Sequence, residues 1–300
     1  MTEYMTSKEL ADFLRIKQRK VYDLAASGRI PCSRAMGKLL FPRAEIEAWV
    51  AQGMGGTGFA AAAAAAAPNV VLGSHDPLLD WALRQSRSGL ATFFDGSADG
   101  LDRFTRAEGV AAGLHMFDPE GSRDAGDDAA WNIGWARRMA ADMPCVLVEF
   151  AWRERGLMFR PGGAGNVHDI GDLRGRLIVP RQPESGAQAL LEHLMGQAWV
   201  APEACTMTEP ARTETEAAEM AAAHGGAVAF GLRASANQFG LAFAPVLRER
   251  FDLLVDRKAW FEPPFQRFLA FCGTREFTLK AAALEGYDVS GLGTVHFVGA

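Results

Sequence analysis

Short apolar runs alternate with segments of helical periodicity along most of the chain after residue 70. Val70–Leu72 lead into a Gly-Ser turn, after which Leu78, Leu79 and Ala82 recur at helical spacing. The same order returns over residues 90–106 and again over residues 177–195. Strand, turn and helix in this order predict an α/β fold with a largely parallel sheet.

Each of these three turns carries a serine next to the start of a helix. The residues are Ser74, Ser97 and Ser185, the last followed by Gly186. A helix N-terminus leaves backbone N–H groups without partners and favours a negatively charged ligand. We expect the three turns to converge on one anion, with one alternative left open, that each serine only caps its helix.

Further strands and helices are expected between and after these turns. Gly109–Asp118 is interpreted as a strand that ends near His115 and Asp118, and an acidic, Gly-rich loop follows over 119–128. The remaining elements are two separate strands over 144–152 and 156–159, a short helix over 168–174, a helix over 214–224 and a strand over 227–230.

The first fifty residues show a different pattern. Thr6 and Glu9 form a capping box, and Leu10, Phe13 and Leu14 then give a short amphipathic helix. A second helix is predicted over 18–26, with Val21 and Leu24 inward. Residues 29–34 and 38–41 are expected to form a β-hairpin, and residues 43–50 a third helix with Ile46, Trp49 and Val50 inward.

The motifs Leu-Ala-Asp-Phe-Leu, Val-Tyr-Asp-Leu, Gly-Arg-Ile-Pro and Phe-Pro-Arg-Ala-Glu-Ile-Glu-Ala-Trp arrive in this order over Thr6–Val50. In this order they resemble the excisionase-type (MerR-like) winged helix-turn-helix family. The resemblance implies that residues of the second helix enter the major groove of DNA and that two wing residues touch phosphate or the minor groove. These are Lys17, Gln18, Arg19, Lys20 and Tyr22 on the helix, with Arg34 and Lys38 on the wing.

The charge distribution agrees with a polyanionic partner at the front of the chain. Residues 1–52 hold nine Lys and Arg against six Asp and Glu, a balance of +3. Because the net charge of the whole chain is −5, residues 53–300 carry a net charge of −8. The alternative is a basic, solvated helix in a protein-interaction module.

A Gly-rich and Ala-rich segment over 53–69 is interpreted as a linker. It separates a helix-turn-helix domain of residues 1–52 from a second domain of residues 70–300. With 300 residues and 49% hydrophobic residues, the chain has material for more than one globular core. No apolar run is long enough to span a membrane, and the start of the chain lacks the features of a signal peptide, so we expect a cytoplasmic protein without a membrane partner. Four cysteines without paired spacing are expected to be buried apolar groups.

Several separated motifs characterise the second domain: Gly-Ser-His-Asp-Pro-Leu-Leu-Asp-Trp-Ala, Phe-Asp-Gly-Ser-x-Asp-Gly-Leu-x-Arg-Phe, Ala-Gly-Leu-His-x-Phe-Asp, Pro-Arg-Gln-Pro-x-Ser-Gly and Ala-Trp-Phe-Glu-Pro-Pro-Phe. Together, over Val70–Val298, they resemble the periplasmic-binding-protein-like domain, of the molybdate- or tungstate-binding type. The resemblance implies a type II fold of two α/β lobes with a ligand held between them. The first lobe would take Val70 to about Val148 together with segments after about Phe251.

The family resemblance also implies ligand-binding positions. Hydroxyl and backbone N–H groups hold a tetrahedral oxyanion in that family, and Ser74, Ser97, Ser185 and Gly186 are the matching positions. Arg181 is a further candidate contact, with an ion pair to Glu184 as the alternative. The chain departs from a simple oxyanion receptor at His75, His115 and Trp131-Asn132, which we expect near the cleft and which allow a larger ligand.

Enzyme interpretations have little support in the sequence. Ser74, His75 and Asp76 are adjacent, so their side chains point apart and cannot form a catalytic relay. The six histidines show no paired metal-ligand spacing, and no Walker or dinucleotide motif is present. Trp260, Phe261, Phe265, Phe268 and Phe271 are expected to form a buried helical face.

These features predict a non-enzymatic transcription regulator that binds double-stranded DNA and senses a small anion, molybdate or tungstate, without a cofactor. We expect a homodimer because one DNA-binding head is small. Two alternatives stay open: the same regulator with an organic effector, and an accessory protein that handles an oxyanion for cofactor assembly without binding DNA.

Overall fold

The structure is a computed structural model that describes residues 4–14, 16–26, 30–35, 38–43, 45–46, 67–119, 130–163, 165, 167–183 and 185–300. The chain divides into two compact units, Met1–Ala65 and Ala66–Ala300. Most of the predicted linker, the acidic loop and the predicted inward residues Trp49 and Val50 lie outside the described residues.

The first unit has the predicted winged helix-turn-helix order. Its described elements are β1 (Tyr4–Thr6), α1 (Ser7–Leu14), α2 (Gln18–Ala26), β2 (Ser33–Ala35) and β3 (Lys38–Pro42). The capping box is confirmed, because Glu9 accepts from the Thr6 N–H at 2.7 Å and Thr6 Oγ1 accepts from the Glu9 N–H at 3.3 Å. The wing is the antiparallel pair β2–β3, and β1 adds a third strand that the sequence pattern did not predict.

A small apolar core holds this unit together. Leu10, Val21, Phe41 and Ile46 are fully buried within it. Phe13, which the pattern counts among the apolar positions of the first helix, lies outside this core, because its side chain is 41% exposed and lies beside the guanidinium of Arg43.

The second unit is built on one large sheet. Its strands are β4 (Val70–Gly73), β5 (Ala91–Phe94), β6 (Ala111–Leu114), β7 (Cys145–Phe159), β8 (Leu177–Val179), β9 (Thr206–Met207), β10 (Ala227–Leu232), β11 (Ala242–Asp256), β12 (Tyr287–Asp288) and β13 (Val295–Val298). The order across the sheet is β5-β4-β6-β11-β7-β10-β8-β9, with β12 and β13 also paired to β7. The strands are parallel within β5-β4-β6 and within β10-β8-β9, and antiparallel around β7 and β11.

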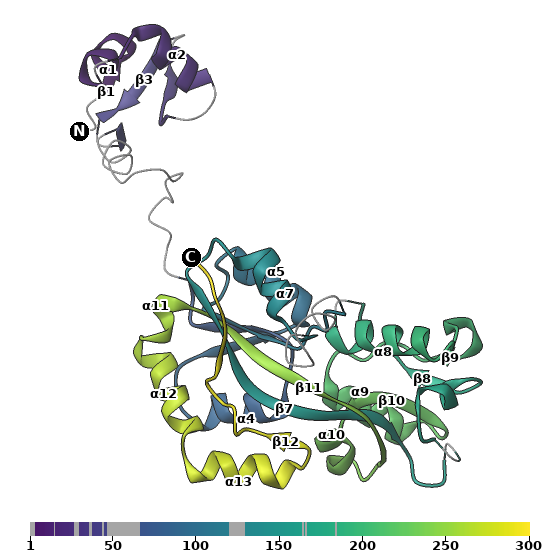
Figure 1. Ribbon diagram of the computed structural model, residues 1–300. Coiled ribbons are helices and arrows are strands. Elements are labelled where there is room, and N and C mark those ends of the chain that lie inside the picture. Colours follow the sequence, from purple (N-terminus) through teal and green to yellow (C-terminus); the bar gives the residue numbers. More distant parts are fainter. Residues whose placement is uncertain are drawn as a thin grey trace. The chain divides into compact units, whose positions relative to one another are not determined.

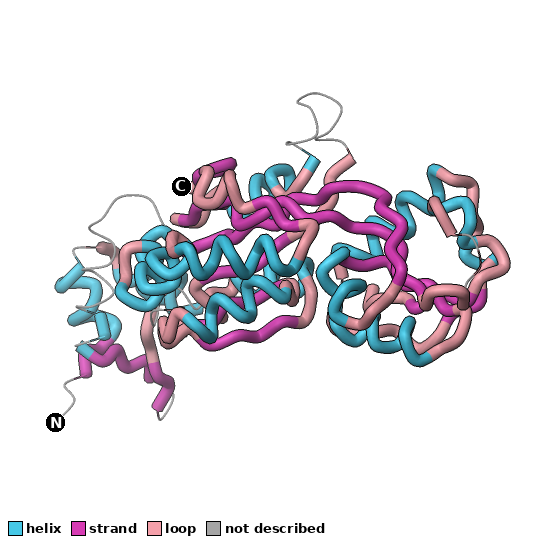
Figure 2. Tube along the Cα trace, turned by 90° about the horizontal axis from the view of Figure 1, so that it is seen from below, coloured by secondary structure: helices cyan, strands magenta, loops and turns pink. Residues whose placement is uncertain are grey.

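Strands β7 and β11 are each 15 residues long and run through both lobes of this unit, as Figures 1 and 2 show. The sequence pattern predicted two separate strands where β7 forms one. The misleading residues are Arg153, Glu154 and Arg155, whose charges look like a break between apolar runs. The strand continues because Arg153 and Arg155 are buried against charged partners.

Helices cover both faces of the first-lobe sheet. The helices are α4 (Pro77–Gln85), α5 (Ser97–Thr105), α7 (Ile133–Ala140), α11 (Arg257–Trp260), α12 (Pro263–Cys272) and α13 (Arg275–Leu284). Consecutive strand residues point to opposite faces. Val71 therefore packs toward α4, α12 and α13, whereas Leu72 packs toward α5 and α7. Burying a side chain of this kind contributes about 1.5–3 kcal/mol.

The second lobe repeats this arrangement around β10. Its helices are the 3₁₀ helices Ile170–Leu173 and Pro202–Ala204, with α8 (Gly186–Gln197), α9 (Glu214–Ala223) and α10 (Arg233–Gln238). Val228 and Phe230 pack in one apolar cluster with α8, and Ala227 and Ala229 pack in another with α9.

Two expectations about burial are partly wrong. Cys145 and Cys272 are buried, but Cys32 is exposed and Cys205 is half-buried. Phe265 and Phe268 are buried as predicted, whereas Phe261 is 74% exposed because it lies between two short helices rather than within one helical face. Among the described residues, no helix is long and apolar enough to cross a membrane.

Candidate functional site

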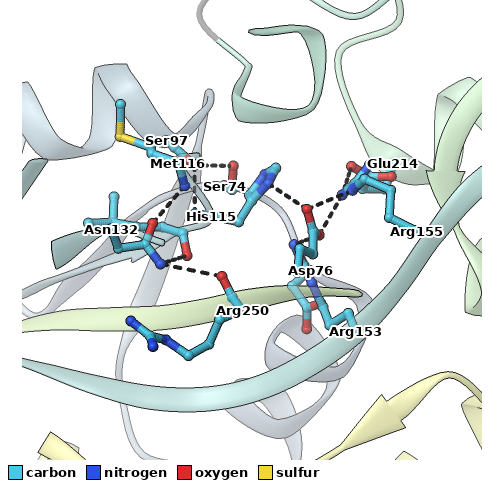
Figure 3. A network of polar contacts seen from close by, with 12 residues as sticks. Ser74, Asp76, Ser97, His115, Met116, Asn132, Arg153, Arg155, Glu214 and Arg250 are labelled. Carbon is cyan, nitrogen blue, oxygen red and sulfur yellow. Dashed lines mark hydrogen bonds and ion pairs between the residues drawn. The ribbon is translucent and has the colours of Figure 1, made fainter. Parts of the chain in front are cut away.

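Two of the predicted serine turns meet at the carboxyl ends of β4 and β5. Ser74 Oγ lies 2.9 Å from Ser97 Oγ, and both side chains are buried (Figure 3). Gly73 makes this close approach possible, because it adopts φ +97° and a Cβ there would overlap the carbonyl of Gly113. The meeting point follows from the parallel pairing of β4 and β5, which aligns Gly73 with Phe94.

The alternative that each serine only caps its helix fails for Ser74 and Ser97, whereas Ser185 does occupy a capping position. Asp76, not Ser74, caps α4 by accepting from the Leu79 N–H at 2.7 Å. Gly96 is the N-cap of α5, and Ser97 is already the first helical residue. Ser185 is the N-cap of α8, but no described side-chain cap bond involves it.

The third turn approaches the first two through His115. The His115 N–H donates to Ser97 Oγ at 3.2 Å, and a Cβ placed on Gly186 would lie 2.9 Å from the His115 carbonyl oxygen. Ser185 is buried beside it. The N-termini of α5 and α8, which belong to different lobes, therefore face the same short segment at the end of β6.

A buried network of three arginines and three carboxylates crosses from one lobe to the other beside this segment. Figure 3 shows four of its members, Asp76, Arg153, Arg155 and Glu214. Arg153 donates to Asp76 in the first lobe at 2.8 Å and pairs with Glu249 on β11. Arg155 donates to the same Glu249 at 2.7 Å and to Glu214, at the start of α9, at 2.9 Å.

Arg181 completes the network in the second lobe. Its Nη1 donates to Glu214 at 2.9 Å, its Nε to the Ala211 carbonyl at 3.1 Å and its Nη2 to the Arg212 carbonyl at 3.0 Å. The predicted alternative partner, Glu184, lies outside the described residues. Because the positive and negative charges of the network are equal in number, the site holds no large excess of either charge.

Some buried donors in this region have no hydrogen-bond partner among the described residues. They are Arg153 Nε, Arg155 Nη1 and His75 Nδ1, of which the last is a donor in only one tautomer. An unpaired buried donor costs free energy. A ligand with acceptor oxygens would satisfy such groups together with the two serine hydroxyls.

Burial and the ion pairs set the pKa values of the network. Burial alone would raise the pKa of Glu214, but the guanidinium groups of Arg155 and Arg181 outweigh it and bring the pKa to about 2. Burial also opposes ionisation of Glu249, yet Arg153 and Arg155 hold its pKa well below the usual value. Burial lowers the pKa of both His75 and His115, which favours their neutral forms.

A second polar cluster lies on the first-lobe side of the site and was not predicted. Asn132 Oδ1 accepts from the Met116 N–H at 2.6 Å, and its Nδ2 donates to Asp252 Oδ2 at 2.8 Å. Arg250 donates to the same carboxylate at 3.0 Å, and its backbone carbonyl accepts from Asn132 Nδ2 at 3.3 Å (Figure 3). Asn132 therefore ties the end of β6 to β11, whereas its neighbour Trp131 packs in the second-lobe core.

An exposed ion pair joins the two lobes at the surface. Arg212, which precedes α9, lies with its Nη2 3.6 Å from Asp95 Oδ1 in the α5 turn. Because both side chains are well exposed, this pair contributes little to stability by itself.

The residues predicted to contact DNA lie on or next to α2 and on the wing. Lys17, Gln18, Arg19, Lys20 and Tyr22 are all exposed on or next to α2, and Val21 between them is fully buried. Arg34 and Lys38 lie on β2 and β3, one register position apart on the wing, and their side chains lie outside the described part of the chain.

The arginines and carboxylates of the network were missed from the sequence. Arg153 and Arg155 carry one usable signal, since charged residues two apart within an apolar strand share one face. Glu214 and Glu249 carry none, because only the tertiary fold brings them to those arginines. Within the described residues, no cluster of His, Cys, Asp and Glu could hold a metal ion.

Two α/β lobes joined by crossing strands, with helix N-termini and polar side chains facing one another, define a ligand-binding domain of the type II periplasmic-binding-like class. A family model described as the PBP superfamily domain matches residues 81–273, and the chain belongs to this family. A second model, described as a helix-turn-helix domain, matches residues 4–54.

The chain is also similar to several individual proteins. The uncharacterized protein YvgK of Bacillus subtilis (strain 168) is 22% identical over 310 residues, which cover 98% of each chain. A putative phosphate ABC transporter substrate-binding protein with bound phosphate, from Clostridium perfringens, gives a TM-score of 0.51 at 11% identity over 76% of this chain and 99% of that chain. The regulatory domain of MetR, a LysR family regulator from N. meningitidis, gives a TM-score of 0.49 at 12% identity over 73% of this chain and 96% of that chain.

At 11% identity, the substrate-binding protein with a TM-score of 0.51 shows the fold and not the ligand. A helix-turn-helix domain followed by a PBP superfamily domain fits a DNA-binding regulator with a ligand-binding domain. Neither matched domain is of a catalytic type.

Proposed function

We propose that the protein is a transcription regulator that acts in the cytosol, binds operator DNA through residues 1–52 and senses a small oxyanion through residues 70–300. The observation that carries the proposal is the meeting of the Ser74 and Ser97 hydroxyls at the N-terminus of α5. Two hydroxyl donors beside a helix N-terminus match the acceptor-only oxygens of an oxyanion.

The second lobe would complete the site. Ser185 and Gly186 at the start of α8 face the His115 segment, and Arg153 and Arg155 offer buried N–H groups that described residues do not use. Since the network balances its own charges, the anion would be held by dipoles and hydrogen bonds rather than by a net positive field. Molybdate and tungstate, which carry no proton at neutral pH, are the anions we propose first.

The DNA-binding part of the proposal is supported by the exposed basic surface of α2. Ligand binding would favour one arrangement of the two lobes through its differential affinity. In a homodimer, this change would alter the spacing of the two heads on the operator. A monomeric mass, both free and on DNA, would exclude the dimer.

Calorimetric titration of the full chain with molybdate, tungstate, sulfate and phosphate tests the sensing proposal. We expect molybdate and tungstate to bind with micromolar or tighter affinity and the other two anions to bind more weakly. If only sulfate or phosphate binds, the choice of anion is wrong but the site is right. If none binds, the oxyanion proposal fails and an organic effector takes its place.

A further inference from the structure

A groove lies on the face of the crossing strands opposite to the serine site. Side chains alternate along β7, so Arg153 and Arg155 face the buried network while Trp152 points to the other side. A register shift opposite Phe251 and Asp252 changes this alternation, and Glu149, which precedes it, lines the same groove as Trp152. On β11, Glu249 faces the network and Arg248 the other side. The groove on that other side has a volume of about 650 Å³, and Trp152 and Arg248 line it. This volume is within the usual range for small-molecule sites.

The walls of the groove differ in chemistry. One wall is aromatic and consists of Phe117, Trp131 and Trp152, with the first two in edge contact at 5.4 Å between ring centres. Two carboxylates, Glu149 and Asp288, also line the groove, and Asp288 is the cross-strand partner of Trp152. Arg248 pairs with Asp288 at 3.0 Å and lies 5.8 Å from the Trp152 ring centre. Among the residues that line the groove, two carboxylates stand against one guanidinium, so the lining has a negative balance.

The two carboxylates differ in how many of their oxygen atoms are already hydrogen-bonded within the protein. Asp288 is satisfied within the protein, since Oδ1 accepts from the N–H and hydroxyl of Ser290 and Oδ2 accepts from Arg248. Glu149 is only 6% exposed, and its Oε2 lies 2.9 Å from His296 Nε2. No described residue makes a hydrogen bond to Glu149 Oε1. A buried carboxylate oxygen therefore remains available at the groove, and it can only accept.

We propose that this groove binds a small planar aromatic molecule that carries a protonated amine or amidine. The ring packs against Trp131 and Trp152, and the N–H group of the ligand donates to Glu149 Oε1. A cationic ring also gains from the faces of the indoles. An aromatic carboxylate is disfavoured because it brings a second negative charge next to Glu149.

The groove is lined by residues of both lobes, so a ligand bound there affects the arrangement of the lobes. Its aromatic wall belongs to the second-lobe core, whereas Glu149 lies in the first-lobe half of β7 and Asp288 on β12. A molecule in the groove contacts both halves of the unit and therefore favours whichever lobe arrangement places these walls at the right spacing.

Titration of the full chain with benzamidine and tryptamine, monitored by calorimetry and tryptophan fluorescence, tests the proposal. Benzoate and indole-3-acetate serve as probes of similar shape and opposite charge. We expect saturable binding of at least one cation, with at least tenfold weaker binding of its anionic counterpart. Binding of neither cation, or equal binding of cation and anion, would overturn the proposal.

Variants distinguish binding in the groove from a general effect of the protein's negative charge. Glu149→Gln should weaken the bound cation at least tenfold, whereas Glu219→Gln, which removes the same charge from an exposed position on α9, should leave it unchanged. Unchanged affinity in Glu149→Gln would contradict the assignment. If that variant does not fold, Trp152→Leu gives an independent measurement, since loss of the aromatic wall should weaken the same probe. None of these outcomes depends on whether the serine site binds an oxyanion.

Discussion

Ser74 Oγ and Ser97 Oγ lie 2.9 Å apart although 23 positions separate the two residues in the chain. The contact depends on the alignment of β4 with β5, and it places two hydroxyl groups at the N-terminus of one helix. Since Asp76 and Gly96 fill the capping positions, the hydroxyls are available for a ligand after a small rotation.

Replacing both serines tests their role. Ser74→Ala combined with Ser97→Ala should weaken molybdate binding at least a hundredfold in calorimetry, because each hydrogen bond to a charged group contributes about 1.5–3 kcal/mol. Ser235→Ala is the matched control, as it removes a buried hydroxyl that makes no described hydrogen bond in α10. Retained molybdate affinity in the double variant would favour an organic effector bound elsewhere in the cleft.

Gly100 is a second structural requirement of the site. A Cβ at this position of α5 would overlap the backbone of Gly73, so Gly100→Ala must push the helix away from β4. We expect a loss of about 2–4 kcal/mol in the free energy of unfolding measured with urea. Gly196→Ala in α8 meets no atom within 4 Å and should instead stabilise the protein by about 0.5–1 kcal/mol. Equal effects of the two substitutions would show that the close packing of α5 on β4 is not required.

Asp252 gives the second unit a dependence on pH. Burial, which Arg250 and Asn132 only partly offset, raises its pKa from 3.8 to about 6. The folded protein therefore holds this proton more strongly than the unfolded chain, so the stabilisation is complete below pH 3.8 and is lost as the pH rises through 6.

Asp252→Asn should remove this dependence. We expect the wild-type free energy of unfolding to fall by on the order of 2 kcal/mol between about pH 4 and pH 7 through this group, and the variant to lack that component. Glu214 has the opposite sign: its stabilisation is present above its unfolded value of 4.5 and is lost as the pH falls toward 2. Urea titrations from about pH 2 to about pH 7 measure both effects, and an unchanged profile in Asp252→Asn would contradict the assignment.

The basic surface of α2 should control DNA binding. Arg19→Ala combined with Lys20→Ala should abolish binding to the protein's own promoter region at moderate salt. At low salt, the dependence of log affinity on log salt should decrease by about two, one for each lost phosphate contact. Fluorescence anisotropy with labelled duplex DNA measures both.

A matched pair of substitutions tests whether charge alone explains the result. Arg257→Ala combined with Lys258→Ala removes the same charge from exposed positions on α11 in the second unit, and it should leave DNA binding intact. Absence of wild-type binding even at low salt would instead favour the accessory-protein alternative.

Local patterns were sufficient to predict much of the fold. The predicted helix over 18–26 matches α2, and the three strand-turn-helix segments were placed to within a few residues. These predictions succeeded because apolar periodicity and Gly-Ser turns are local properties. The meeting of the serine turns was also predictable, since the carboxyl ends of parallel strands lie at one edge of a sheet.

The ion network was beyond such reasoning. Arg153 and Arg155 looked like a polar break because their partners are far away in the sequence. Glu249 reaches them only through the register of β7 with β11, and Glu214 only through the position of α9. Phe13 also shows that a local pattern does not decide burial. It is an apolar position of the first helix, but Leu10 and its neighbours form the small core and Phe13 stays exposed.

Strands β7 and β11 pair along almost their whole length, from Ala242 opposite Phe159 to Asp256 opposite Cys145. The two lobes therefore share one hydrogen-bonded ladder, with register shifts at Pro245/Leu247 and Phe251/Asp252, instead of being tethered by loops. Neither lobe can lose its structure without exposing the edge of the other, so the domain should melt in a single cooperative transition. Substitutions in one lobe should for the same reason lower the melting temperature of the whole domain.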